Sequence, residues 1–380
     1  MHTGQPLSSA FSGRNNSMGM LRVVFASLVI VSHAFPIGGW GTDPADDWWH
    51  GQADISTLGL LGFFALSGFL VTRSARRRDV VQYFWARFLR IYPAYFVVLL
   101  VGAFLVGPWF YAREHGSLGG YWRSHPEGPF TYVLLNLGVE QRQRGIADVW
   151  RDLPHGEISE ASVLNIPLWT LWWEVVCYVM VGGLAVLGIL KLARFVVPLL
   201  ALVLMAGATI TEYVPEVGWS YAQGKILSLV CIFLLGATLE LYADKVPMAR
   251  RWGLLAIGVV VLTLSTGLFS SVGYAAFAYL VLWLSVHLPA ALHGVGRRTD
   301  LTYGLYIYGW PVAMGLADYG VPQAWGYWAF VLMTFALTVP LAWLSWHYIE
   351  KPALALKTRD VGQRVAALRA RWRPTVDQQA

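Results

Sequence analysis

Residues 56–73 read STLGLLGFFALSGFLVTR, an apolar run that carries no charged side chain until Arg73. A helix needs about 20 mainly apolar residues to cross a bilayer, and this run comes close to that length. The whole chain has a matching composition, with 56% hydrophobic and only 13% charged residues. An ordinary soluble domain carries about 25% charged residues. The sequence therefore predicts an all-α protein whose solvent is lipid.

Similar apolar windows lie on both sides of this run. Together they predict about ten spans, near residues 19–37, 56–73, 84–110, 168–190, 195–211, 222–243, 253–269, 272–290, 302–317 and 325–348. The apolar stretch 130–139 is too short to cross, so we expect an interfacial or re-entrant segment there. The first window lacks a small-residue cleavage pattern, and we interpret it as a retained helix and not a signal peptide. The predicted fold is a polytopic transmembrane helix bundle.

Basic residues lie in short clusters between these windows. A cytoplasmic N-terminus places most of the 28 Lys and Arg residues on the cytoplasmic side, including six arginines between residues 73 and 90. Cytoplasmic loops carry such an excess, so we expect both termini to be cytoplasmic. We interpret Arg76, Arg77 and Arg78 as part of this topology signal. The expected organisation is a cytoplasmic N-terminal segment at 1–18, a transmembrane domain at 19–350 and a basic cytoplasmic tail at 351–380.

The net charge of +6 could indicate nucleic-acid binding, but its distribution indicates membrane topology and contact with lipid instead. We therefore expect membrane lipid as a partner and no nucleic acid. Cys177 and Cys231 both lie inside apolar runs, where a free thiol behaves as a small hydrophobic group. No spacing of residues suggests a metal site, so no metal is expected.

Two ionisable residues lie in the first predicted span. Arg22 and His33 have ten residues between them, which places them about 16 Å apart along a helix axis. An ionisable residue inside a span is costly and indicates function by default, although an arginine at a helix end often only reaches for the interface. His33 lies in the apolar sequence SLVIVSHAF and can act as a general base.

The second and third spans add further candidates. GFFALSGFL contains Gly62, Ser67 and Gly68, whose small side chains permit close helix packing; Ser67 either serves that packing or contacts substrate. In RFLRIYP, Arg87 and Arg90 are three residues apart and share a helix face. Two guanidiniums in that arrangement could bind a phosphate group.

The fourth span begins PLWTLWWEVVCY and contains Glu174. A carboxylate inside a span needs a partner or a proton, so Glu174 is expected to orient His33 or to bind a hydroxyl of an acceptor. The indoles of Trp169, Trp172 and Trp173 offer stacking faces to a sugar ring. The alternative is an aromatic belt at the outer interface with a structural glutamate.

In this order, these elements resemble the acyltransferase 3 family of membrane O-acyltransferases, which includes bacterial polysaccharide O-acetylases. The resemblance runs from Arg22 to Lys357 and also includes TYGLYIYGWPV at 302–312 and WHYIEKPAL at 346–354. The chain departs from many relatives at Gly309, where they carry a histidine. This departure argues against a role for that segment in proton transfer.

The resemblance implies a multi-pass enzyme of the bacterial inner membrane that transfers an acyl group, commonly acetyl, from cytoplasmic acyl-CoA to a hydroxyl of a glycan or its lipid-linked precursor. It implies that His33 is catalytic, that Arg22 belongs to the same motif, and that Arg87 and Arg90 bind the phosphates of the donor. We count Arg22 as a third candidate for binding the donor. Acyl-CoA would be a substrate and not a resident cofactor. Glu174 is expected to share the catalytic site and Ser67 the substrate site; a covalent acyl-Ser67 is a less favoured route.

Three alternatives stay open at this point. The acceptor could be a small molecule such as an antibiotic. The protein could instead be a transporter of a lipid-linked sugar, although such proteins tend to have inverted repeats, and none stands out here. A membrane scaffold without chemistry would leave His33 and Glu174 unexplained inside the membrane.

Overall fold

The computed structural model describes residues 4–11, 15–214 and 221–358. Helices and loops, without a β-strand, make up these described ranges. The long helices are α2 (Met18–Gly38), α4 (Ile55–Arg77), α5 (Val80–Val101), α9 (Trp169–Val186), α11 (Val196–Tyr213), α12 (Tyr221–Leu241), α13 (Arg250–Thr266), α14 (Tyr274–His287), α15 (Thr302–Asp318) and α16 (Val321–Ser345). The short helices are α1 (Leu7–Ala10), α3 (Pro44–Trp48), α6 (Gly107–His115), α7 (Pro129–Asn136), α8 (Pro154–Ser159), α10 (Ile189–Leu192) and α17 (Lys351–Ala355). The predicted all-α bundle is confirmed.

Eight helices within the described residues are long and apolar enough to cross a membrane. The two other predicted spans correspond to α13 and α15, which have 17 residues each. A helix of that length spans about 25 Å, the lower end of the range for a crossing. The chain is therefore a multi-pass membrane protein. Most of the predicted basic tail, from residue 359 on, and residues 1–3 and 12–14 of the predicted N-terminal segment lie outside the described residues.

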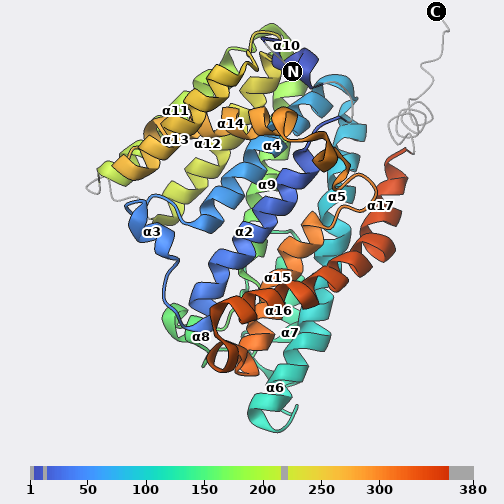
Figure 1. The fold of residues 1–380 in the computed structure, drawn as a ribbon. Coiled ribbons are helices and arrows are strands. Elements are labelled where there is room, and N and C mark those ends of the chain that lie inside the picture. Colours follow the sequence, from blue (N-terminus) through green and yellow to red (C-terminus); the bar gives the residue numbers. More distant parts are fainter. Residues whose placement is uncertain (1–3, 12–14, 215–220, 359–380) are drawn as a thin grey trace, which may run out of the picture.

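Two spans are longer than the sequence predicted. Residues 80–115 continue as one helix through a π-helical turn at Gly102–Val106, and a second π-helical turn at Trp346–Glu350 extends the last long helix to Ala355. That last helix begins at Val321 but is kinked at Gly326, whose φ of 75° is not helical. The apolar stretch around residues 130–139 is largely α7, an eight-residue helix that is too short to cross, as predicted. It lies in the long connection between α6 and α9, near the end of the bundle where α6 and α8 also lie (Figure 1).

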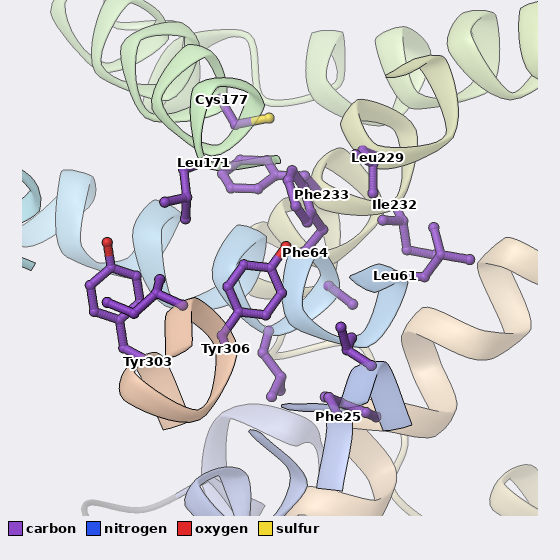
Figure 2. Packing of buried hydrophobic residues seen from close by; sticks show 14 of the residues in the cluster. Phe25, Leu61, Phe64, Leu171, Cys177, Leu229, Ile232, Phe233, Tyr303 and Tyr306 are labelled. Atoms are coloured by element: carbon purple, nitrogen blue, oxygen red, sulfur yellow. The ribbon is translucent and has the colours of Figure 1, made fainter. Parts of the chain in front are cut away.

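Helices α2, α4 and α9 lie in the middle of the bundle (Figure 1). Helices α11 and α13 lie to one side of them, whereas α5 and α17 lie to the other (Figure 1). Buried aromatic and aliphatic side chains such as Phe64, Leu171 and Phe233 fill the space where α4, α9 and α12 meet (Figure 2). On the same helix α4, Ser67 contacts Glu174 of α9 in the site described below.

Glycine allows α4 and α12 to pack closely. A Cβ atom on Gly68 would lie 1.9 Å from the carbonyl oxygen of Phe233, and one on Gly236 would lie 2.1 Å from that of Ala65. Real atoms do not approach so closely, so any side chain at either position would push the helices apart. The close approach predicted from the sequence GFFALSGFL is therefore confirmed.

Helices α2 and α15 run side by side in the same direction. Near their N-terminal ends, Arg22 pairs with Asp300, and about three turns later His33 contacts Trp310. Along their whole shared length, residues of α2 therefore lie beside residues 300–310 of the chain, in the same order. We call this arrangement the shared register of α2 and α15.

Candidate active site

A cavity of about 510 Å³ lies between α2, α4, α5, α9 and α15. The predicted site residues that line it are Arg22, Ser67, Arg87, Arg90 and Glu174. The lining residues of α4 give its direction, because Leu60 and Phe63 lie near one end of the helix and Arg77 and Arg78 near the other. At 1.5 Å per residue, this wall is about 25 Å long. We call these two ends the inner end and the basic end.

Five cationic side chains line the basic end: Arg73, Arg77, Arg78, Arg87 and Lys357. The guanidinium of Arg87 lies 5.5 Å from the ring centroid of Tyr178, and its Nε has no hydrogen-bond partner within the described residues. Arg76 points elsewhere and pairs with Glu240 at 3.6 Å. A cleft lined by charge of one sign concentrates ligands of the other sign, and guanidinium groups suit phosphate. The arginines at 77 and 78 therefore line a site in addition to carrying the predicted topology signal.

Asp300 joins the two other predicted donor-binding arginines. Its Oδ2 accepts hydrogen bonds from Arg22 Nη1 and from Arg90 Nη2, each at 3.0 Å. Burial raises the pKa of Asp300, but Arg22 and Arg90 outweigh it and hold the pKa well below its usual range. Glu350 lies 3.9 Å from Arg90 Nη1 and accepts a hydrogen bond from Ser345. Arg22 and Arg90 thus already have carboxylate partners, whereas no carboxylate among the described residues pairs with Arg87.

Glu174 lies within the cavity and not beside His33. Its Oε1 accepts a hydrogen bond of 2.9 Å from Ser67 Oγ, and Tyr178 donates a second hydrogen bond to the same oxygen. Because Ser67 donates to a carboxylate, its hydroxyl is polarised within the cavity and does more than fill space between helices. The structure brings Glu174 together with Ser67, and it places both between the two ends of the cavity.

Hydroxyl and aromatic groups form the inner end. Thr170 Oγ1 lies 2.5 Å from the hydroxyl of Tyr306, which donates to the carbonyl of Pro167 at 2.9 Å. Phe63 packs edge-to-face on Tyr306, with 6.0 Å between ring centroids. These groups close the cavity on the side where the shared register of α2 and α15 places His33.

His33 lies about one helical turn beyond this inner end. It does not line the cavity, but it packs on Trp310 with 5.0 Å between ring centroids and an interplanar angle of 83°. Trp310 follows Tyr306 by four residues on α15, so the two positions are about 6 Å apart along the helix axis. His33 therefore lies close to the inner end of the cavity, which Phe63 and Tyr306 line.

The three predicted tryptophans lie outside the cavity lining. Trp169 and Trp173 pack against the hydrophobic core, and Trp172 is half-buried. The structure therefore does not bring these indoles together with Ser67 and Glu174, although Thr170 and Leu171 from the same turn do line the cavity.

Several cavity residues were missed by the sequence analysis. Asp300 carried a signal, since an acidic residue at the basic side of a span runs against the charge bias of that side. The sequence contains no signal for Tyr178 or Tyr306, because aromatic residues are common in apolar windows. Lys357 was placed in the basic tail and not in a site.

The sequence profile of the acyltransferase 3 family, described as an acyltransferase domain, matches residues 15–347. The chain belongs to this family. The acyltransferase is 25% identical over 347 residues to an O-acetyl transferase of Shigella phage Sf6, with 89% of this chain and 96% of the relative covered. It is 27% identical over 392 residues to nodulation protein 10 of Rhizobium leguminosarum bv. viciae, with 95% and 99% covered. No solved structure matches it.

The family match and the O-acetyl transferase relative identify this protein as a membrane O-acyltransferase. Such an enzyme needs an acyl donor and an acceptor hydroxyl. Within the part of the chain that the structure describes, no group of three or more His, Cys, Asp or Glu residues could hold a metal ion. The charge of the basic end suits an anionic ligand.

Proposed function

We propose that this acyltransferase moves an acyl group, in the first place acetyl, from cytoplasmic acyl-CoA to a hydroxyl of a cell-surface glycan or its lipid-linked precursor, in the bacterial inner membrane. The observation that carries the proposal is the cavity, cationic at one end and closed by hydroxyl and aromatic groups next to His33 at the other. In the proposed orientation, both termini and the basic end face the cytoplasm. The concentration of arginines around that end supports this orientation.

The shape and charge of the cavity suit acyl-CoA. This donor has phosphate groups at one end and a long, thin pantetheine arm that ends in a thioester. A volume of about 510 Å³ lies within the usual range for small-molecule sites. With the phosphates between Arg87 and Lys357, the arm extends along α4 past Ser67 and Glu174, and the thioester reaches the inner end.

The proposed reaction is a direct acyl transfer. His33 accepts the proton of the acceptor hydroxyl as general base. The hydroxyl oxygen then forms a bond to the thioester carbonyl carbon, the carbon–sulfur bond breaks, and the thiolate of CoA leaves and takes the proton from protonated His33, which restores the base. The hydroxyls of Thr170 and Tyr306 lie closest to the inner end. To stabilise the carbonyl oxygen during the attack, one of them turns its proton away from the carbonyl of Pro167, to which both donate in this structure. The acetyl group is supported by the name of the phage relative.

Replacing Arg87 with alanine tests the donor site. We expect the acetyl-CoA concentration for half-maximal transfer to rise at least tenfold, because a hydrogen bond to a charged group contributes about 1.5–3 kcal/mol and 1.4 kcal/mol is a factor of ten. Purified protein in detergent is incubated with radiolabelled acetyl-CoA and a total glycan and lipid extract of its host, and initial rates of labelling are measured. Arg250, an exposed arginine at the start of α13, provides the matched control Arg250→Ala.

If the Arg87→Ala and Arg250→Ala variants need the same acetyl-CoA concentration for half-maximal transfer, the proposed phosphate site is refuted. A wild-type protein that neither binds nor consumes acetyl-CoA would refute this donor, and the acyl group would then have to come from a different donor.

Donor binding should also depend on pH through Lys357. Burial, together with Arg87, Arg78 and Arg90, lowers the pKa of Lys357 to about 8. The ammonium form that attracts phosphate is present below that pH and is lost above it, so acetyl-CoA is expected to bind several-fold more weakly at pH 9 than at pH 7. Equilibrium binding of labelled acetyl-CoA measures the effect. Lys357→Arg should remove the pH dependence, since arginine stays protonated; an unchanged pH profile in that variant would assign the effect to another group.

A further inference from the structure

Two histidines from distant parts of the chain meet on one tryptophan. His33 of α2 and His155 of α8 lie 5.0 Å and 4.8 Å from the ring centroid of Trp310, with interplanar angles of 83° and 84°. His155 comes from the long connection between α6 and α9, which the sequence analysis left without a role. The catalytic histidine of the proposed mechanism therefore shares Trp310 with a second imidazole, and neither histidine lines the cavity.

Three buried polar atoms of this group lack partners within the described residues. Both ring nitrogens of His155 and the indole Nε1 of Trp310 are buried, and none has a hydrogen-bond partner within the described residues. A buried polar group left unsatisfied costs about 1–3 kcal/mol, so three such atoms in one place are unusual for packing alone. Functional sites are where such groups are retained, because a ligand satisfies them when it binds.

The chemistry of these atoms suits hydroxyl groups. Burial lowers the pKa of His155 to about 4, so its ring is neutral at pH 7 and offers one donor and one acceptor nitrogen. The indole of Trp310 adds a second donor. A hydroxyl group both donates and accepts, so two neighbouring hydroxyls of one ligand can satisfy all three atoms. A carboxylate or phosphate could accept from the two donors but could not donate to the acceptor nitrogen.

The connection that carries His155 is held firmly against the bundle. Pro154 packs at the C-terminal end of α2, where its Cγ lies 3.3 Å from the position of a Cβ on Gly39. Asn165 Nδ2 donates to the carbonyl of Ile307 on α15 at 2.8 Å, and Ser162 Oγ donates to Val149 at 2.7 Å. These contacts fix α8 relative to both α2 and α15, so the position of His155 beside Trp310 is part of the folded structure.

We infer that His33, His155 and Trp310 form the acceptor site, and that His155 determines specificity by binding a second hydroxyl of a polyhydroxylated acceptor while His33 acts on the hydroxyl that is acylated. The inference rests on the proposed function, since it gives the acceptor of that reaction its binding site. None of the three residues lines the donor cavity. Donor and acceptor accordingly approach the inner end from opposite sides, and acceptors with a single isolated hydroxyl are poor substrates.

The test compares wild type with His155→Ala and His155→Gln, and uses His115→Ala as the matched control. His115 is an exposed histidine at the end of α6 that stacks on Tyr111. Labelled acetyl-CoA is held at saturation, and the transfer rate is measured against the concentration of the host glycan and lipid extract. Binding of acetyl-CoA without extract is measured in parallel.

We expect His155→Ala to raise the half-saturating extract concentration at least tenfold and to leave acetyl-CoA binding within twofold of wild type. His155→Gln keeps an amide donor and acceptor and should recover part of the loss. An unchanged half-saturating concentration in His155→Ala overturns the inference. So does an equal loss of donor binding in both variants, which would indicate that His155 only supports packing.

Failure of the proposed function gives a different result. If wild type transfers no label, the acyl-transfer proposal fails, and carbethoxylation of His155 by diethyl pyrocarbonate then decides the site by itself. Protection of His155 by the extract but not by acetyl-CoA supports a hydroxyl-binding site. Equal modification with and without extract overturns it.

Discussion

Replacement of His33 with alanine is expected to lower the rate of acyl transfer by 10²–10⁴-fold, the range that general base catalysis contributes. His33 does not line the donor cavity, so binding of acetyl-CoA should stay within twofold of wild type. We therefore expect the maximal rate to fall while the acetyl-CoA concentration for half-saturation stays unchanged. Initial rates with labelled acetyl-CoA and host extract, together with equilibrium donor binding, measure both quantities.

Two further variants separate chemistry from structure at this position. His33→Gln keeps a polar side chain of similar size but has no basic nitrogen, so it should be as inactive as His33→Ala. His115→Ala should behave as wild type. If either His33 variant retains more than a tenth of the wild-type rate, another group takes the proton, and His155 is then the nearest imidazole to examine.

The second large effect is expected for Asp300→Asn. The carboxylate of Asp300 is only 12% exposed and accepts from both Arg22 and Arg90, which are 26% and 18% exposed. Removing one partner of a buried ion pair leaves an uncompensated charge and costs about 3–5 kcal/mol. We therefore expect a lower unfolding temperature in detergent. Because these guanidiniums also line the donor cavity, we expect the transfer rate to fall at least 100-fold as well.

A double variant tests the physical cause. Asp300→Asn combined with Arg22→Gln removes the excess positive charge, and Arg90 keeps Glu350 at 3.9 Å. Its unfolding temperature should recover toward that of wild type, whereas its activity should not. Asp244→Asn, at an exposed position, is the matched control. If Asp300→Asn unfolds at the same temperature as wild type, and the added Arg22→Gln does not raise that temperature, then Asp300 does not hold the two arginines together.

The fold was largely predictable because membrane spans depend on local composition. An apolar window of about 20 residues must be helical in lipid whatever its neighbours are, since every backbone polar group needs an internal partner. The ends of the helices were less predictable. The long helix at 321–355 continues through polar residues such as His347 and Glu350, because a π turn and the packing of neighbouring helices extend it beyond its apolar part.

The candidate site was predictable only in part. Arg22, Ser67, Arg87, Arg90 and Glu174 were selected because ionisable or small residues stand out against apolar surroundings, and all five line one cavity. The partnership of Glu174 with Ser67, and not with His33, depends on how α4 and α9 are rotated toward each other. Tryptophans at 169, 172 and 173 were selected by type, but the rotation of α9 directs the smaller Thr170 and Leu171 to the cavity instead.

The sequence alone determined that this chain is a multi-pass helical membrane protein, because hydrophobic length is a local property of each segment. It also predicted, from the charge bias of the loops, that the basic residues gather on one side. The tertiary structure alone decided which arginines are neutralised, by bringing Asp300 to Arg22 and Arg90 across three helices. It also brought His155 from a loop to the ring beside His33. Pairing and burial depend on distances between segments far apart in the chain, and no local pattern contains those distances.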